Sequence, residues 1–472
     1  IQMIGEHLGV AHVLEGSVRY QGDRVRVTAQ LIKADDGFHL WSETYDREPR
    51  DLLALQDDIA RQVVNSLHVL LSPDSREALS RVTTVDPLAY DYYLRGRAYL
   101  RLPRDEANLE FAVELFRKAV AQHAAFADAY AGLCDGLLGL YSTGRDVADF
   151  ESAESACHRA LTLDRRAASV YIALGNLYRS SGQYDQAIGE FNTALSLNRT
   201  LPDAHLGLGD TYMEKSDLET AEQHYRTAIE LQPNYWQALM SMGNFLFQVG
   251  RVEEAIPYYR RISELMPESE TAFNNMGAAY FVTGDFERAS SAWQRSLDLA
   301  PSSTAYSNVA SSEFFLGHYD RAVSLYHKAV ELAPEDYELW GNLADAYRHS
   351  DYGLEMAEPM YRNAIRLAEN RLRINASDVG TLALAGHYCA SIGEREQAVK
   401  FITEAAALAP GNMYVDYNAA TAWAALGERE RALQAVERAV ASGYPRHIAA
   451  ADANLEALRG TDRFRALTEA KR

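Results

Sequence analysis

The chain has 472 residues, of which 47% are hydrophobic, so it is long enough to bury a large core or several smaller ones. Lys and Arg total 46 against 66 Asp and Glu, and the formal net charge of -20 repels phosphate backbones, so nucleic acid is not expected as a partner. No stretch of about 18 apolar residues occurs, so no membrane span is expected in this segment.

The first 75 residues predict a small segment that contains strands. Valine, threonine and tyrosine alternate with polar residues in "VLEGSVRYQGDRVRVTAQLI", which is typical of a half-buried β-hairpin. The expected elements are a helix at Ile4–Leu8, strands at Ala11–Tyr20, Arg24–Ile32 and His39–Tyr45, turns at Gly22-Asp23 and Asp35-Asp36-Gly37, and a helix at Leu52–Leu71. A sheet this small has unpaired edges, so we expect its edge to pair with a further strand or with a second copy in a homo-oligomer.

From residue 86 a pattern repeats every 34 residues. A small residue is followed by an alanine in the next predicted helix and then by a bulky residue four positions further on. The small residues are Gly175, Gly209, Gly243 and Gly277, continued by Ala310 and Ala344, and the bulky residues are Phe191, Tyr225, Tyr259, Trp293 and Tyr326.

This pattern resembles the tetratricopeptide repeat family, in which each unit is a helix-turn-helix hairpin. Small residues let the two helices of a hairpin approach closely, and the bulky residues fill the gap toward the next hairpin. A single hairpin leaves an apolar face exposed, so the hairpins must stack. The resemblance implies a mainly α protein, a right-handed tetratricopeptide α-solenoid of about ten hairpins over residues 86–440, closed by a charged helical cap at 441–472.

The segment before the repeats resembles the TolB-like amino-terminal domain that precedes such repeats in many bacterial proteins. The stretch "LGVAHVLEGSVRYQGDRVRVTAQLIKADDGFHLWSETYDRE" carries this resemblance. In that family a strand and two helices come before the part seen here, so residues 1–75 are expected to be a partial α/β domain.

Three repeats are longer than the others. Extra residues occur at "RLPRDEANLE", "LYSTGRDVADFE" and "RLAENRLRINASDVG". They predict longer loops or longer helices, which are either candidate contact points for a partner or ordinary variation between repeats.

The three cysteines show no ligand spacing for zinc. Cys134 and Cys157 fall on core positions of the second repeat, so they are expected to be small buried side chains, as is Cys389. The sequence leaves open whether Cys134 and Cys157 pair, which would require an oxidising compartment.

The chain lacks recognised catalytic motifs. It contains no HExxH, GxxxxGK[ST] or GxSxG pattern, and its thirteen histidines are scattered. We therefore expect no enzyme activity, no cofactor and no bound metal.

In the repeat family the first helix of each hairpin lines a concave groove, and the residue two positions before the small one points into it. Asn275, Asn308 and Asn342 occupy that place in consecutive repeats. An Asn amide offers both a donor and an acceptor, so a ladder of amides can bind the backbone of an extended peptide. The arrangement resembles the asparagine ladder of the O-linked GlcNAc transferase.

Three phenylalanines lie near the ladder. Phe281, Phe314 and Phe315 are expected either to form apolar pockets beside it or to pack against the adjacent repeat. Both alternatives remain open at this point.

The sequence thus predicts a bacterial, non-catalytic interaction scaffold or sensory module that binds a protein or peptide in the groove. One alternative is the regulatory arm of a membrane-anchored signalling enzyme or transcription regulator, with an upstream cyclase, kinase or winged-helix output. Another is a structural subunit that self-assembles or decorates a filament. The resemblance favours the periplasmic side of a membrane over the cytoplasm.

Overall fold

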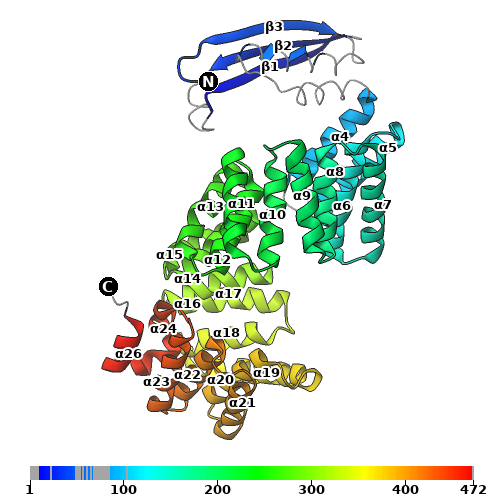
Figure 1. Ribbon diagram of the computed structural model, residues 1–472. Helices are drawn as coiled ribbons and strands as arrows, with labels where there is room; N and C mark the ends of the chain where they lie inside the picture. The colour runs from blue at the N-terminus through cyan, green and yellow to red at the C-terminus, as the bar shows by residue number, and fades with distance from the viewer. Residues whose placement is uncertain are drawn as a thin grey trace. The chain divides into compact units, whose positions relative to one another are not determined.

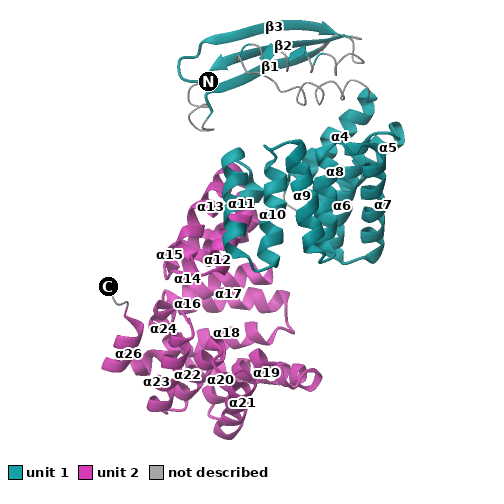
Figure 2. Ribbon diagram, viewed as in Figure 1, with its two compact units in different colours: residues 1–238 teal, residues 239–472 magenta. Residues whose placement is uncertain are grey.

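The computed structural model describes residues 10–21, 24–47, 85–102 and 105–469, together with residues 55, 58, 59, 62, 63 and 66. The chain forms two compact units, Ile1–Ala238 (unit 1) and Leu239–Arg472 (unit 2), which Figure 2 shows in different colours. The helix expected at Ile4–Leu8, the Gly22-Asp23 turn and most of the helix expected at Leu52–Leu71 lie outside the described residues.

Unit 1 contains an antiparallel sheet with the strand order β1-β2-β3 (Figure 1). The strands are β1 (His12–Gln21), β2 (Arg24–Lys33) and β3 (His39–Arg47), so the three predicted strands are confirmed to within two residues. Gly37 ends the second turn with a φ of +70°, which glycine adopts without strain. Val25, Ala29 and Leu31 are buried and point to one face of the central strand. The assignment of this sheet to a TolB-like domain remains a prediction.

From residue 87 on, the described part of unit 1 consists of helical hairpins. Aspartates cap several of these helices: Asp86, for example, accepts hydrogen bonds from the backbone N–H groups of Leu88 and Ala89. The helices are α4 (Pro87–Leu100), α5 (Glu106–Gln122), α6 (Ala127–Gly144), α7 (Val147–Leu163), α8 (Ala168–Ser180), α9 (Tyr184–Leu197), α10 (Pro202–Glu214) and α11 (Leu218–Leu231).

Unit 2 continues the same pairing of helices. The next helices are α12 (Trp236–Gln248), which starts at the end of unit 1, α13 (Val252–Leu265), α14 (Glu270–Val282), α15 (Phe286–Leu299), α16 (Ser303–Phe315), α17 (Tyr319–Leu332), α18 (Tyr337–His349), α19 (Gly353–Ile374), α20 (Val379–Ser391), α21 (Arg395–Leu408), α22 (Met413–Ala425) and α23 (Arg429–Ala441). In the part of the chain that the structure describes, α4 to α23 form ten consecutive pairs, which confirms the predicted mainly α class of stacked hairpins.

The predicted close approach of small and bulky residues is confirmed. A Cβ atom on Gly175 would lie 2.6 Å from Cε1 of Phe191, and one on Gly207 would lie 2.3 Å from Cζ of the same ring. Phe191 therefore fills the space both within its hairpin and toward the next one. Because real Cβ atoms do not come so close, the two glycines are needed for this packing.

The irregular repeats take the form of long helices. α5 and α7 have 17 residues each, α6 has 18 and α19 has 22, whereas most of the other helices have 13 or 14. No helix among the described residues is long and apolar enough to cross a membrane.

A disulfide joins Cys134 on α6 to Cys157 on α7, with their Cα atoms 5.4 Å apart. The structure thus answers a question that the sequence left open. Cys389 is a buried free thiol, and burial raises its pKa to about 12.

Candidate functional site

The three asparagines of the predicted ladder lie on α14, α16 and α18, and all three are partly exposed. Asn275 Nδ2 donates to Asn244 Oδ1 at 3.2 Å, and Asn308 Nδ2 donates to Asn274 Oδ1 at 3.0 Å. Asn342 makes no side-chain hydrogen bond to any described residue. The preceding hairpin therefore orients two of the three amides. Both N–H groups of Asn275 are engaged, with Asn244 Oδ1 and with Met240 Sδ, but each of the three amides keeps an Oδ1 acceptor without a partner in the described part of the chain.

The three phenylalanines near this row contact one another and the neighbouring helices. The ring centroids of Phe281 and Phe315 are 5.1 Å apart, and Phe315 lies 5.0 Å from Phe286. Phe314 is buried and contacts His349 at 5.8 Å. Phe314 therefore packs against the adjacent repeat, while Phe281 and Phe315 keep partly exposed faces.

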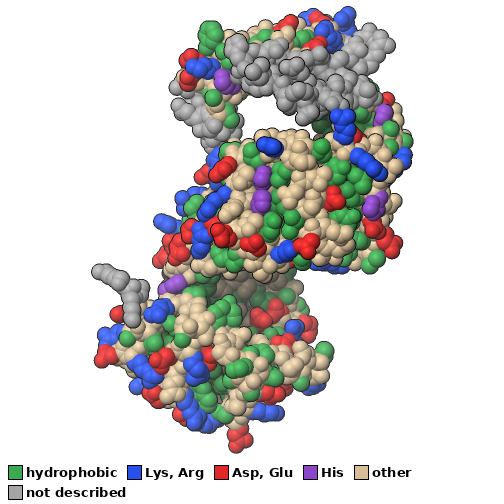
Figure 3. Space-filling model, in the orientation of Figure 1, with side chains coloured by type: hydrophobic (Ala, Val, Ile, Leu, Met, Phe, Trp, Pro, Cys, Tyr) green, Lys and Arg blue, Asp and Glu red, His purple; other side chains and the backbone are tan. Residues whose placement is uncertain are grey.

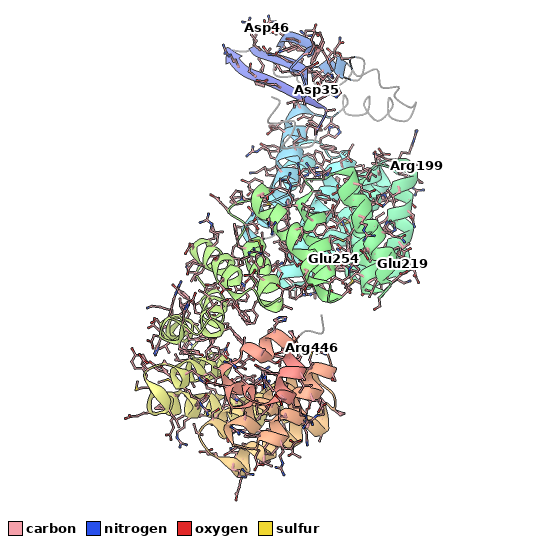
Figure 4. All side chains as sticks on the ribbon, turned by 90° about the vertical axis from the view of Figure 1, so that its left-hand side faces the viewer. Asp35, Asp46, Arg199, Glu219, Glu254 and Arg446 are labelled. Carbon is pink, nitrogen blue, oxygen red and sulfur yellow. A yellow bond between two sulfur atoms is a disulfide. The ribbon has the colours of Figure 1, made fainter. Side chains whose placement is uncertain are left out.

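Residues 446–468, called the tail here, fold back onto unit 2. The tail contains α24 (Arg446–Ala451), a 3₁₀ turn η3 (Ala453–Leu455), α25 (Glu456–Arg459) and α26 (Asp462–Thr468). Arg446, labelled in Figure 4, marks its beginning. His447 Nε2 donates to the carbonyl oxygen of Val282, the last residue of α14, and His349 Nε2 donates to Asn454 Oδ1 at 3.0 Å. The tail thus contacts the carboxyl ends of α14 and α18.

The tail is part of the core of unit 2. Ile448, Leu455, Leu458 and Phe464 are buried in the same apolar cluster as residues of α16 to α23. Figure 1 shows α24 and α26 near α22 and α23. The segment expected from sequence to be a charged cap therefore also buries an apolar side.

The three asparagine side chains stay partly exposed in the presence of the tail. Val282 and His349 each follow a ladder asparagine, Asn275 or Asn342, by seven residues in the same helix. Seven helical residues span about 10 Å along the helix axis. These two hydrogen bonds of the tail therefore lie about that far from the amides along the helices, near the helix ends.

A buried polar cluster joins α18, α19 and α20. His387 Nε2 lies 3.0 Å from Asp345 Oδ1, and the hydroxyl group of Tyr361 donates to the same carboxylate. Burial alone would raise the pKa of Asp345, but His387 and these hydrogen bonds hold it below its ordinary value. Ser391 is also on α20, yet both His387 and Ser391 are buried, so this constellation links helices and presents no nucleophile to solvent.

A recurring polar contact was not found in the sequence. Tyr225 Oη donates to Asp210 Oδ1 at 3.0 Å, and Tyr259 Oη donates to Asn244 Oδ1 at 2.9 Å. In each hairpin the acceptor directly follows the small residue of the first helix, and the tyrosine is the bulky residue of the second. The constant separation of 15 residues between a polar residue and a tyrosine was the available signal.

Unit 1 contains a cavity of about 580 Å³, called the unit 1 cavity, whose walls come mainly from α4, α6, α8 and α10. Trp236 Nε1 donates to the carbonyl oxygen of Arg101 at 2.6 Å and brings the start of α12 to the end of α4. On the cavity floor, Asn176 Nδ2 donates to Asp135 Oδ1 at 2.9 Å. Among the described residues no three His, Cys, Asp or Glu side chains are grouped as they would be around a metal ion.

Family models match several of these hairpins. A TPR repeat model matches residues 175–216, and tetratricopeptide repeat models match residues 206–270, 310–353 and 413–438. The chain therefore carries tetratricopeptide repeats in both units.

A curated relative shares a shorter stretch. The chain is 44% identical over 97 residues to the putative adenylate cyclase 3 of Rhizobium meliloti (strain 1021). The match covers 21% of this chain and 16% of that protein, so the chain spans a small part of its relative.

Solved structures that are similar to the chain include several repeat proteins. PilF of Pseudomonas aeruginosa is 18% identical with a TM-score of 0.39, and the match covers 46% of this chain and 95% of that one. YrrB, described as a TPR protein with an unusual peptide-binding site, is 26% identical with a TM-score of 0.29, covering 41% and 96%. MamA of Desulfovibrio magneticus RS-1 is 18% identical with a TM-score of 0.33, covering 35% and 95%.

Proposed function

We propose that the tetratricopeptide hairpins of this chain form a non-catalytic scaffold that binds an extended segment of another protein. The observation that carries this proposal is the row of amides at Asn275, Asn308 and Asn342. Their carbonyl oxygens are unpartnered in the described part of the chain, and two of the three are held in place by hydrogen bonds to the preceding hairpin.

The spacing of the row suits an extended backbone. Packed helices lie about 8–10 Å apart, and three residues of an extended chain in the polyproline II conformation, which make one turn and so repeat the direction of the backbone groups, span about 9 Å. A peptide that crosses the first helices can therefore place one backbone N–H near each Asn Oδ1. Because the amides contact the backbone, binding by the row depends little on the side chains of the peptide, while the partly exposed rings of Phe281 and Phe315 offer apolar contacts beside it.

The test compares the wild type with the triple variant Asn275→Ala, Asn308→Ala, Asn342→Ala. A partner is first captured from lysate of the native organism and identified, and its affinity is then measured by calorimetry. Three hydrogen bonds of about 0.5–1.5 kcal/mol each predict a loss of roughly ten-fold to a thousand-fold.

Asn370→Ala is the matched control, because Asn370 is exposed on α19 away from the row. Equal affinity of the triple variant and the wild type for the same partner would refute the role of the row. Circular dichroism verifies that both variants fold.

A second candidate function is supported by the match to the putative adenylate cyclase 3. The chain would then be the regulatory arm of a longer membrane-anchored bacterial protein that carries a cyclase, kinase or winged-helix output, with a TolB-like segment before the repeats. The periplasmic side of the membrane remains the favoured location under this proposal. Sequencing the full reading frame tests it, since an output domain in the same frame supports it and a frame without one refutes it.

A third candidate function, self-assembly, is supported by the described sheet. β1 pairs with β2 and is an edge of this sheet, and its residues Leu14 and Val18 are exposed. Another copy could extend the sheet at this edge. Light scattering coupled to gel filtration tests the idea: Val18→Lys should convert an oligomer into a monomer, and a wild type that is monomeric at all concentrations would refute it.

A further inference from the structure

The unit 1 cavity has basic side chains at one end of its helices. Arg101 and Arg145 are the C-caps of α4 and α6, and Arg179 lies in the last turn of α8. None of the three forms an ion pair with a described carboxylate. Nε of Arg179 is enclosed and has no hydrogen-bond partner, which is unusual for a buried donor. We call these three residues the basic rim.

The opposite end of the same helices is acidic. Asp128 and Asp203 lie in the first turns of α6 and α10 and also line the cavity. Ser169 at the start of α8 donates to Asp128, and Tyr235 donates to Asp203, which also forms an ion pair with Arg97 of the cavity wall at 3.9 Å. We call Asp128 and Asp203 the acidic rim. From Ser169 to Arg179 the helix axis of α8 advances about 15 Å, which is the separation of the two rims.

Helix dipoles explain only part of this arrangement. Acidic residues at amino ends and basic residues at carboxyl ends of helices are each favoured by the helix dipole. The dipole does not require these side chains to line one cavity, and it does not supply a partner for the enclosed Nε of Arg179. Glu214 at the end of α10 interrupts the pattern, so the basic rim covers the first three hairpins.

We infer that the unit 1 cavity binds an extended polypeptide segment in which acidic and basic residues alternate. Successive side chains of an extended chain point to opposite sides. A segment that crosses the helices therefore presents its acidic residues to Arg101, Arg145 and Arg179 and its basic residues to Asp128 and Asp203. A segment of one sign places half of its charges against a rim of the same sign, which is unfavourable.

This inference goes beyond the proposed function and stands without it, because it concerns other residues in the other unit. The hydrogen bonds on the floor of the cavity also indicate that the basic rim is the part open to a ligand. Asp135 and Asp210 accept hydrogen bonds from Asn176 and Tyr225, whereas the arginines of the basic rim have no carboxylate partner among the described residues.

The experiment uses fluorescein-labelled 12-residue peptides and the whole chain. The four probes are alternating Glu-Lys, all Glu, all Lys and alternating Gly-Ser, and fluorescence anisotropy at physiological salt gives each affinity. We expect the alternating Glu-Lys peptide to bind at least ten-fold more tightly than the other three. Tightest binding of the all-Lys peptide would overturn the inference, because it would report only the net charge of -20.

Variants then locate the binding site. Arg145→Glu with Arg179→Glu should weaken binding of the alternating peptide at least ten-fold, and the corresponding Gln pair, which adds no repulsion, should weaken it in the same direction. Arg165→Glu with Arg199→Glu is the matched control, since both arginines are exposed in unit 1 and neither lines the cavity; Arg199 is labelled in Figure 4.

Equal losses in the control pair and the cavity pair would overturn the inference. The triple asparagine variant should bind the alternating peptide like the wild type, so failure of the ladder proposal and failure of this one give different results. Circular dichroism confirms that each variant is folded.

Discussion

Replacing Phe464 by alanine should release the tail from unit 2. The Phe464 ring is 2% exposed and is the only aromatic side chain of α26, in the core cluster that includes residues of α22 and α23. Removing a buried Phe side chain costs about 3–5 kcal/mol, because the transfer energy is lost and a cavity remains. At about 1.4 kcal/mol for each factor of ten, the population of molecules with an open tail should rise roughly a hundred-fold to a few thousand-fold.

Hydrogen exchange measured by mass spectrometry reports this population directly, since amide protons of residues 446–468 exchange when the tail opens. Phe111→Ala is the control, because Phe111 on α5 is 52% exposed and its removal should change tail exchange by less than a factor of two or three. Unchanged protection of the tail in Phe464→Ala would refute the docking of this segment on unit 2.

Three further predictions concern the packing and charge of the hairpins. Gly277→Ala should destabilise unit 2 by about 1–3 kcal/mol in denaturant unfolding, because the new Cβ would lie 2.5 Å from Cδ1 of Trp293, whereas Gly189→Ala, with nothing within 4 Å, should stabilise α9 by up to about 1 kcal/mol. Reduction of the α6–α7 disulfide, which closes a separation of 23 residues, should cost about 3 kcal/mol, and an unchanged melting temperature after reduction would contradict this. The pKa of Asp345 is lowered in the folded state, so its contribution is present above its ordinary value of 3.8 and is lost as the pH falls through the lower folded pKa; Asp345→Asn should flatten acid unfolding in that range.

Charged residues of both signs are interspersed on the face shown in Figure 3. This distribution agrees with the surface ion pairs, such as Arg251 with Glu254 and Arg362 with Glu358, which each contribute little to stability. Charge at the surface therefore says little about a partner, and the arrangement inside the cavity is the more informative feature. The absence of a nucleic-acid partner stays a prediction from the net charge.

The hairpins could be predicted because their signals are local. Gly209 and Tyr225 are 16 residues apart and recur with the 34-residue period, and the resemblance of this pattern to the tetratricopeptide repeat implied two helices with a turn between them. The three strands could also be predicted, because the alternation of apolar and polar residues that indicates a strand is a local signal of a few positions.

The rest depends on contacts that sequence spacing does not reveal. His447 and Val282 are 165 residues apart, and the short helices of the tail carry no period that would indicate where they dock. The basic rim is assembled from three different hairpins, each of which contributes one arginine. Pairing of Cys134 with Cys157 required the distance between two helices, which their positions in the repeat did not supply.

The tail also changes how unit 2 should respond to force. In a stack where each hairpin contacts only its neighbours, pulling on the carboxyl end unfolds one hairpin after another. The hydrogen bonds from His447 to Val282 and from His349 to Asn454 connect the tail directly to α14 and α18, several hairpins earlier in the chain. These hydrogen bonds must break before the last hairpin, α22 with α23, can detach. We therefore expect α14 to α23 to unfold together when the chain is pulled from its carboxyl end.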